Sequence, residues 1–385
     1  MWLWQRWVRH AALGLAIVAA VGVVHKSGLY RFSRSRPAKR AVEQTQPPVV
    51  DAIKKWGGTL SSDSVNLRFT AITDAEVGAL RELPELSSLD LSGTAITDAG
   101  LAELKHLTGL RSLTLSSTKI TDAGLAELRS LTGLQSLNLA FTPITDAGLL
   151  SVKELVGLQS LDLAGTKITD TGLTHLRDLT NLQSLNLGFT PITDAALPEL
   201  KHFPSLHTLD LASTPITNAG LLALKELASL QSLNVGHTGI SDAGVATIAS
   251  LTQLHTLDLG FTRMTNAGLV ELKRLAKLES LDISGTAVTD AGLRELTSLT
   301  ELRTLGLSHT ATTSTGLKHI SELVGLRVLD LSGSPVTYGG LKDLMNLVNL
   351  EHLDLRFTRI PEGKSREFGA SMPKLKIDHR VEFIP

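Results

Sequence analysis

Apolar residues recur along this chain with a fixed 24-residue period. The stretch from Leu86 to Gly109 reads LSSLDLSGTAITDAGLAELKHLTG, and the chain then repeats it with little change. Its first leucine returns without insertion or deletion at Leu86, Leu110, Leu134, Leu158, Leu182, Leu206, Leu230, Leu254, Leu278, Leu302, Leu326 and Leu350. Self-similarity at such a period predicts a solenoid, in which successive copies stack onto one continuous core.

We number the positions of each copy from its first leucine, so that Leu86 is position 1. Leucines at positions 4 and 6 alternate with polar residues and predict a short, half-buried strand. The segment T-D-A-G-L predicts a helix, because Thr97 can cap its start and the helix dipole favours the carboxylate of Asp98. Gly100 permits close backbone approach. The threonine at position 9 is expected to bond to loop backbone, and the leucines of the inner helix face are Leu101, Leu104 and Leu107.

The pattern L-x-x-L-x-L-x-x-T-x-I-T-D-A-G-L-x-x-L-x-x-L resembles the leucine-rich repeat from about Ser62 to Ile377. It looks most like the bacterial 24-residue subtype and is similar to the cysteine-containing repeats of F-box proteins, with Thr in place of Cys. The resemblance implies an α/β fold, a curved leucine-rich-repeat solenoid with a parallel sheet on the concave face and short helices on the convex face. Such families mostly bind other proteins, which is an analogy at the level of the fold.

The array is expected to cover residues 62–371, between an N-terminal cap at 49–61 and a C-terminal cap at 372–385. In the first cap, a short helix places Val49, Ile53 and Trp56 on one face. At the far end, Met372, Leu375 and Ile377 repeat the strand leucines in a shortened, 22-residue final copy. Two internal copies depart from the pattern, which indicates either local drift or a change of curvature; they contain residues 196–198 and 311–315.

Residues 1–32 have the composition of a signal peptide or a signal anchor. Two Arg and three Trp precede an uncharged apolar run that extends from Ala11 to Val24. A retained anchor, a cleaved signal for secretion or the periplasm, and a buried amphipathic helix remain alternatives, and the side of the membrane stays open. Residues 33–48 form a basic linker that contains Pro47 and Pro48.

Charge and composition exclude several kinds of function. Residues 1–40 hold eight Lys or Arg and no acid, so the rest of a chain with formal charge −1 carries −9, unlike a nucleic-acid-binding face. The chain has no Cys, its His residues are scattered, and it contains no H-E-x-x-H, G-x-S-x-G or phosphate-loop motif. We therefore expect no metal, no cofactor and no enzymatic activity.

Position 5 points outward on the concave face and forms what we call the carboxylate–amide row. Its members are Asn66, Asp90, Thr114, Asn138, Asp162, Asn186, Asp210, Asn234, Asp258, Asp282, Gly306, Asp330 and Asp354. The row is either a solvated face in which amides neighbour carboxylates, or part of a partner-binding surface. Asp162 and Asp210, about 9.6 Å apart, nearly suit a glycosidase pair, but a flat row offers no pocket to raise a pKa. Adjacent Asp258 and Asp282, and likewise Asp330 and Asp354, should repel each other unless a cation or a proton intervenes.

Position 8 follows the strand and holds what we call the aromatic row. Its members are Phe69, Phe141, Phe189, Phe261 and Phe357, with His237 and His309. The rings either form exposed anchors for a partner or stack on loop neighbours such as Pro143 and Pro191. The sequence predicts a monomeric protein-binding scaffold, membrane-anchored or exported. A structural protein of the cell envelope is an alternative, and an F-box-like adaptor is less favoured because residues 41–61 are too few for its helical domain.

Overall fold

The computed structural model describes residues 48–379, and the predicted leader, most of the linker and the last six residues lie outside this range. Fifteen strands form one sheet in chain order. The strands are β1 (Thr59–Ser61), β2 (Ser64–Asn66), β3 (Ser88–Asp90), β4 (Ser112–Thr114), β5 (Ser136–Asn138), β6 (Ser160–Asp162), β7 (Ser184–Asn186), β8 (Thr208–Asp210), β9 (Ser232–Asn234), β10 (Thr256–Asp258), β11 (Ser280–Asp282), β12 (Thr304–Gly306), β13 (Val328–Asp330), β14 (His352–Asp354) and β15 (Lys376–Asp378).

Short helices connect consecutive strands. The α-helices are α2 (Pro48–Lys55), α3 (Asp74–Val77), α4 (Asp98–Leu104), α5 (Asp122–Leu125), α6 (Asp146–Val152), α7 (Asp170–Thr174), α8 (Asp242–Ile248), α9 (Asn266–Leu272), α10 (Asp290–Leu293), α11 (Leu317–Ile320), α12 (Tyr338–Leu341) and α13 (Glu362–Ser371). The 3-10 helices are η1 (Gly78–Glu82), η2 (Ala126–Ser130), η3 (Leu197–His202), η4 (Gly220–Glu226), η5 (Arg294–Ser298) and η6 (Lys342–Asn346).

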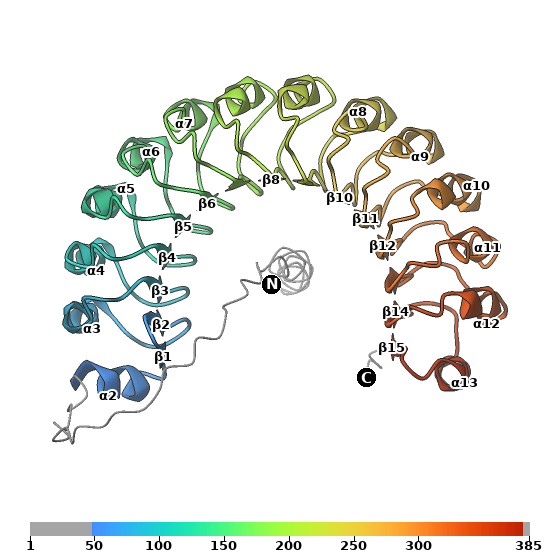
Figure 1. The fold of residues 1–385 in the computed structure, drawn as a ribbon, viewed down its shortest axis with the longest axis horizontal. Helices are drawn as coiled ribbons and strands as arrows, with labels where there is room; N and C mark the ends of the chain where they lie inside the picture. The colour runs from blue at the N-terminus through green and yellow to red at the C-terminus, as the bar shows by residue number, and fades with distance from the viewer. Residues whose placement is uncertain (1–47, 380–385) are drawn as a thin grey trace, which may run out of the picture. The chain divides into compact units, whose positions relative to one another are not determined.

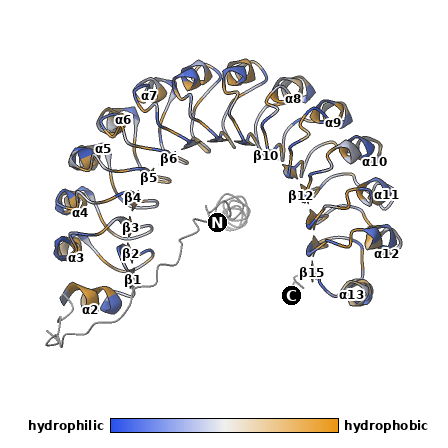
Figure 2. Cartoon of the chain, viewed as in Figure 1, coloured by the Kyte–Doolittle hydropathy of each residue, from blue (hydrophilic) through white to orange (hydrophobic). Residues whose placement is uncertain are grey.

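Residues 48–379 form an open arc, with the strands on the inner side and the helices on the outer side (Figure 1). From β2 to β15, each strand pairs in parallel with the next at a 24-residue offset, as in Leu185 with Leu209. This confirms the predicted leucine-rich-repeat solenoid with a parallel sheet. Each helix carries both apolar and hydrophilic residues (Figure 2), and the leucines of strands and helices join one buried core.

Both ends differ in detail from the sequence-based expectation. Before the parallel strands, β1 pairs with β2 antiparallel, and the sequence analysis missed this hairpin. In α2, Val50 is buried beside Val49 and Ile53, whereas Trp56 lies just after the helix and is only partly buried. At the other end, Ile377 pairs with Leu353, so the final strand keeps the 24-residue offset and the predicted 22-residue copy is wrong.

The two irregular copies change the structure only locally. The copy with Pro198 starts its helix as η3 instead of an α-helix, but the next copy, which lacks this proline, also has a 3-10 helix, η4. In the other irregular copy, Thr312 occupies a buried apolar position, and the Thr310 hydroxyl donates to its hydroxyl at 2.8 Å. This bond gives the buried hydroxyl of Thr312 a hydrogen-bond partner.

Threonine at position 9 stabilises the turn that follows each strand, as the sequence predicted. Thr94 is buried, and its Oγ1 donates to the carbonyl of Leu91 at 2.7 Å. The same bond recurs from copy to copy, for example from Thr190 to Leu187 at 2.5 Å. A buried hydroxyl that lacked such a partner would destabilise the fold, which explains why this position takes a small hydroxyl side chain.

Candidate functional site

The aromatic row lies at a backbone position that is left-handed in every copy. Phe141 has φ +56° and Phe189 has φ +59°, while Gly93 and Gly165 occupy the same position with φ +65°. Here the chain leaves the strand, and the amide of Phe141 donates to the carbonyl of Ala164 in the next copy at 2.7 Å. A non-glycine residue in this conformation costs roughly 1–2 kcal/mol. The Phe residues of this row therefore occupy a backbone conformation that is unfavourable for any residue other than glycine.

The phenyl rings of this row are exposed. Their exposed fractions are 72% for Phe69, 57% for Phe141, 37% for Phe189, 43% for Phe261 and 48% for Phe357. Three of them lie over the glycine at the same position of the next copy: a Cβ on Gly93, Gly165 or Gly285 would come within 2.4–2.5 Å of a ring carbon of Phe69, Phe141 or Phe261. Because these glycines have no side chain, each ring can pack directly against the backbone of the next copy.

Neighbouring rings also contact each other in the middle of the row. The ring centroids of Phe141 and Phe189 are 6.2 Å apart at an interplanar angle of 49°. The imidazole of His237 stacks on Phe261 at 4.4 Å and 10°. Pairs of this kind stabilise one another beyond their simple burial. The row is therefore a set of supported rings with exposed surface, as binding anchors require.

The carboxylate–amide row is explained first by the local turn. Asp90 Oδ1 accepts from the amide of Ser92 at 2.9 Å, and the equivalent bond from position 7 to position 5 recurs at Ala164 and Asp162 at 3.0 Å. Asp and Asn both make this bond, which mimics a backbone turn. The sequence analysis missed this role, although an Asp or Asn two residues before each turn is the signal for it.

Two carboxylates of this row accept from amides on adjacent strands. Asn138 Nδ2 donates to Asp162 Oδ2 at 3.0 Å, and Asn234 Nδ2 donates to Asp210 Oδ2 at 3.0 Å. Burial between neighbouring strands nevertheless raises the pKa of Asp162 to about 6 and raises the pKa of Asp210. The expectation that a flat row has nothing to raise a carboxylate pKa is therefore wrong.

The neighbouring carboxylates of Asp258 and Asp282 repel each other. They are paired directly across β10 and β11. Burial, followed by repulsion from Asp282, raises the pKa of Asp258 to about 8. Burial likewise raises the pKa of Asp330 to about 6, with smaller repulsion from Asp354 and Asp282. Ionising the carboxylates of Asp258 and Asp330 therefore costs free energy unless a cation lies close to them.

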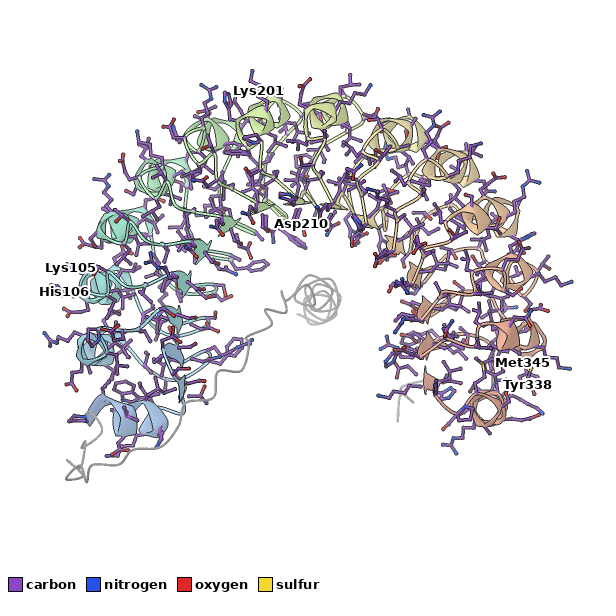
Figure 3. The ribbon with its side chains drawn as sticks, viewed as in Figure 1. Lys105, His106, Lys201, Asp210, Tyr338 and Met345 are labelled. Atoms are coloured by element: carbon purple, nitrogen blue, oxygen red, sulfur yellow. The ribbon has the colours of Figure 1, made fainter. Side chains whose placement is uncertain are left out.

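All nine site residues predicted from the sequence lie on the strand face or its adjoining turn. Asp210 lies on the inner side of the arc, whereas Lys105, His106 and Lys201 lie on the outer side (Figure 3). The structure therefore places the carboxylate–amide row on the strands and the aromatic row in the turns that follow them. Residues 48–379 contain no group of three His, Cys, Asp or Glu side chains arranged to hold an ion.

A second set of aspartates, which the sequence assigned to the helix dipole, connects the copies instead. Asp122 Oδ1 accepts from the amide of Thr145 in the next copy at 2.8 Å, and its Oδ2 accepts from the hydroxyl of Thr145 at 2.6 Å. We call this the aspartate–threonine row; its acceptors are Asp74, Asp98, Asp122, Asp146, Asp170, Asp194, Asn218, Asp242, Asn266, Asp290 and Ser314. A Cβ on Gly124 would lie 2.3 Å from the Asp98 carboxylate, so glycine makes room for the link.

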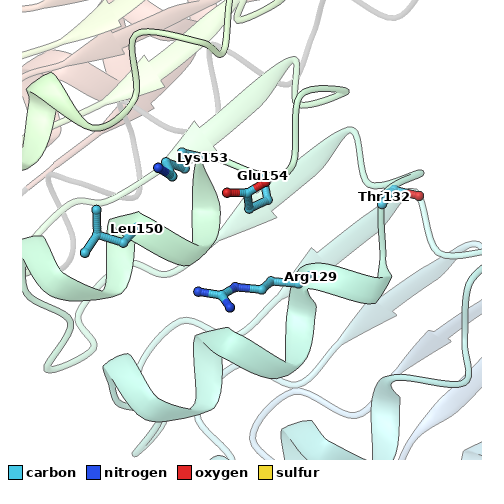
Figure 4. Close-up of a pocket in the computed structure, with 5 residues that line it drawn as sticks. All are labelled: Arg129, Thr132, Leu150, Lys153 and Glu154. Carbon is cyan, nitrogen blue, oxygen red and sulfur yellow. The ribbon is translucent and has the colours of Figure 1, made fainter.

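The helix side contains a hollow of different chemistry. Its lining residues are Arg129, Thr132, Leu150, Lys153 and Glu154 (Figure 4). Small-molecule sites are usually lined mainly by apolar side chains with a few polar groups. One leucine among four polar residues does not fit that description, so we keep the concave face as the candidate site.

Models of leucine-rich repeats match residues 63–144, 156–249 and 274–296, which together cover just over half of the chain. The chain is a leucine-rich repeat protein. The structure is similar to an internalin of Listeria monocytogenes, with 24% identity and a TM-score of 0.60 over 83% of this chain and 86% of that chain. It is also similar to a leucine-rich repeat protein of Leptospira interrogans, with 21% identity and a TM-score of 0.51 over 78% and 86%.

These identities show a shared leucine-rich-repeat fold and nothing finer, and no curated protein matches the sequence. Leucine-rich repeat proteins generally bind other proteins, because stacked repeats create an extended concave surface. Within residues 48–379, none of the helices has the length and apolar character needed to cross a membrane.

Proposed function

We propose that this leucine-rich repeat protein is a non-enzymatic, monomeric scaffold that binds a protein partner through its concave face, with the aromatic row as the anchor. The observation that carries the proposal is the conformation of the row: five exposed phenylalanines occupy a left-handed position where glycine would be less strained. Strain that persists in a structure is a reason to infer function. Interface hot spots favour aromatic residues.

The carboxylate–amide row supplies the second part of the binding surface. Asp162, Asp210, Asp258 and Asp282 end their strands, three residues before the aromatic position in the same copy, and make this part of the face acidic when they are ionised. Electrostatic complementarity mainly sets orientation and rate of association. We therefore assign affinity to the rings and orientation to the carboxylates.

Partner capture tests the proposal directly. Full-length protein and a variant with Phe141→Ser, Phe189→Ser and Phe261→Ser are compared as baits in membrane and soluble extracts of the native cells. Loss of hot-spot anchors should weaken binding of a captured partner by more than about 2 kcal/mol. The thermal midpoint should change little, because exposed rings contribute less to stability than core residues. A variant that loses stability but binds equally well would show that the rings serve only the fold.

We also propose that residues 1–32 attach the protein to a membrane or export it, and that the chain belongs to the bacterial 24-residue subtype. The leader's Arg-flanked apolar run and the unbroken 24-residue period support these two assignments. The full-length chain should sediment with membranes or be processed, and a chain that begins at Ala41 should be soluble. Uncleaved full-length protein in the soluble fraction would contradict the membrane assignment, and capture of envelope polymer alone would favour the structural alternative.

A further inference from the structure

The side chain at position 7, between the carboxylate–amide row and the aromatic row, differs between the ends and the middle of the array. The first copy has Arg68 and the copy before the last strand has Arg356. Between them the position is always small: Ser92, Ser116, Ala140, Ala164, Gly188, Ala212, Gly236, Gly260, Ser284, Ser308 and Ser332. The fold thus accepts arginine at this position but omits it throughout the middle.

The two terminal arginines show which contacts a guanidinium makes on this surface. Arg356 Nε donates to both carboxylate oxygens of Asp354, at 3.0 and 2.8 Å, and its Nη2 donates to Oδ2. Arg68 Cζ lies 5.0 Å from the centroid of the Phe69 ring. One arginine therefore neutralises the carboxylate–amide row, and the other lies over the aromatic row.

The middle of the face offers both kinds of contact without an arginine of its own. Asp258 and Asp282 are side by side, and no ion pair joins either of them to a Lys, Arg or His within residues 48–379. A Cβ on Gly260 would lie 3.1 Å from Asp258 Oδ1 and 3.7 Å from Asp282 Cγ. The next residue is Phe261, whose ring is 43% exposed.

We propose that this place, which we call the arginine subsite and define by Asp258, Gly260, Phe261 and Asp282, receives an arginine side chain from an extended segment of the partner protein. The inference rests on the proposed binding function and specifies the chemistry of the partner. The partner's guanidinium would take, beside Asp258 and Asp282, the place that Arg356 takes beside Asp354 in its own copy, next to the stacked pair of Phe261 and His237.

Arginine fits this subsite better than lysine for two reasons. Its planar guanidinium can donate to two carboxylates at once, and it can lie flat against an aromatic ring. It is also less strongly hydrated than an ammonium group, so it loses less on entering a half-buried site. A basic segment recognised only by its net charge would not distinguish the two residues.

Peptide binding to the full-length chain tests the subsite. The probes are fluorescein-labelled hexa-arginine and hexa-lysine peptides, measured by fluorescence anisotropy at pH 8 and about 0.15 M salt, where exposed charges are screened beyond about 8 Å. We expect the arginine peptide to bind at least about tenfold more tightly, which corresponds to about 1.4 kcal/mol. Equal affinities of the two peptides would overturn the proposal.

A single substitution can fill the subsite from within. Gly260→Arg places a guanidinium where the end copies have one, and it should weaken binding of the arginine peptide at least about tenfold. Gly260→Ala adds the Cβ alone, and its effect should stay below about threefold because other copies have Ala at this position. Asp178→Asn, at an exposed carboxylate between α7 and β7 and outside both rows, is the control for the loss of one charge, and it should leave binding unchanged.

Two further measurements keep the test decisive. If Gly260→Arg fails to fold, the double variant Asp258→Asn, Asp282→Asn replaces it and should abolish the preference for arginine. Concentration-dependent self-association that Gly260→Arg removes would assign the surface to a second copy of the chain and contradict the proposal. If the triple phenylalanine variant loses its partner but Gly260→Arg does not, the binding function stands and the arginine subsite is wrong.

Discussion

Two rows of aspartates run along this solenoid with the same 24-residue period, and the structure gives them opposite roles. In the aspartate–threonine row, each carboxylate accepts two hydrogen bonds from the next copy, as Asp122 does from Thr145. In the carboxylate–amide row, one oxygen accepts from its own turn and repulsion builds up where carboxylates are adjacent, as at Asp258 and Asp282. A periodic residue in a repeat is therefore not assigned to stability or to binding by its period alone.

Substitutions in the hydrophobic core are expected to change the free energy of unfolding most, and they provide the reference for both rows. Leu185→Ala removes a fully buried side chain between two neighbouring copies and should lower the free energy of unfolding by roughly 2–5 kcal/mol. Leu353→Ala should lower it less, because terminal units open more easily. Denaturant midpoints measure both variants, and equal losses would contradict an array whose ends are less stable.

Breaking one link of the aspartate–threonine row should have the next largest effect. Asp242 accepts from the amide and hydroxyl of Thr265, both at 2.8 Å, and from the amide of Gly268 at 2.9 Å. Asp242→Ala leaves the amide and the hydroxyl of Thr265 without this acceptor, whereas the amide of Gly268 keeps the carbonyl of Thr265 at 3.1 Å. The variant should destabilise the protein by about 2–3 kcal/mol.

The matched control for this link is Asp242→Asn. Asn266 and Asn218 already link their copies to the next: Oδ1 accepts from the backbone amide as Asp does, and Nδ2 donates to the hydroxyl instead of accepting from it. The loss should therefore stay below about 1 kcal/mol. Urea denaturation of the two variants compares them. If Asp242→Asn were as unstable as Asp242→Ala, the link would depend on the carboxylate itself rather than on hydrogen bonds that an amide can also make.

Removing a charge from the carboxylate–amide row should have the opposite sign and the smallest size. Asp258→Asn keeps the acceptor for the amide of Gly260 and removes repulsion with Asp282, so it should stabilise the protein by about 1 kcal/mol near neutral pH. The native pKa of Asp258 is raised from 3.8 to about 8. Below about pH 4 Asp258 is protonated in both the folded and the unfolded protein, so it costs no stability there. As the pH rises towards 8, the unfolded state loses this proton more readily, and the folded protein becomes progressively less stable.

The advantage of Asp258→Asn should consequently be larger at pH 8 than at pH 5. Thermal denaturation at both values measures it, with Asp90→Asn as the control, because Asn66 and Thr114 on the neighbouring strands are uncharged. An advantage that does not grow with pH would show that the pKa of Asp258 is not raised in the native protein, and the proposed repulsion between Asp258 and Asp282 would then be wrong.

The aromatic row shows how far sequence reasoning reached at the candidate site. The recurrence of Phe at position 8 is visible in the sequence, and so is the glycine in the following copy. The left-handed backbone is not, because Phe, Ser, His and Gly all occupy it and only Gly and Ser would suggest a turn. The packing of the Phe141 ring on Gly165 is a contact between position 8 of one copy and position 8 of the next, so it follows only from the stacking of those copies.

The sequence by itself determined the period, the strand and helix positions, the core and the parallel solenoid, because each of these follows from apolar residues that must be buried in every copy. Tertiary structure decided what depends on the neighbouring copy: the hairpin before the first repeat, the partner of each aspartate, the offset of the last strand and the burial that raises the pKa of Asp258. Local pattern specifies which face of a repeat is buried, but contacts between repeats exist only once the sheet has formed.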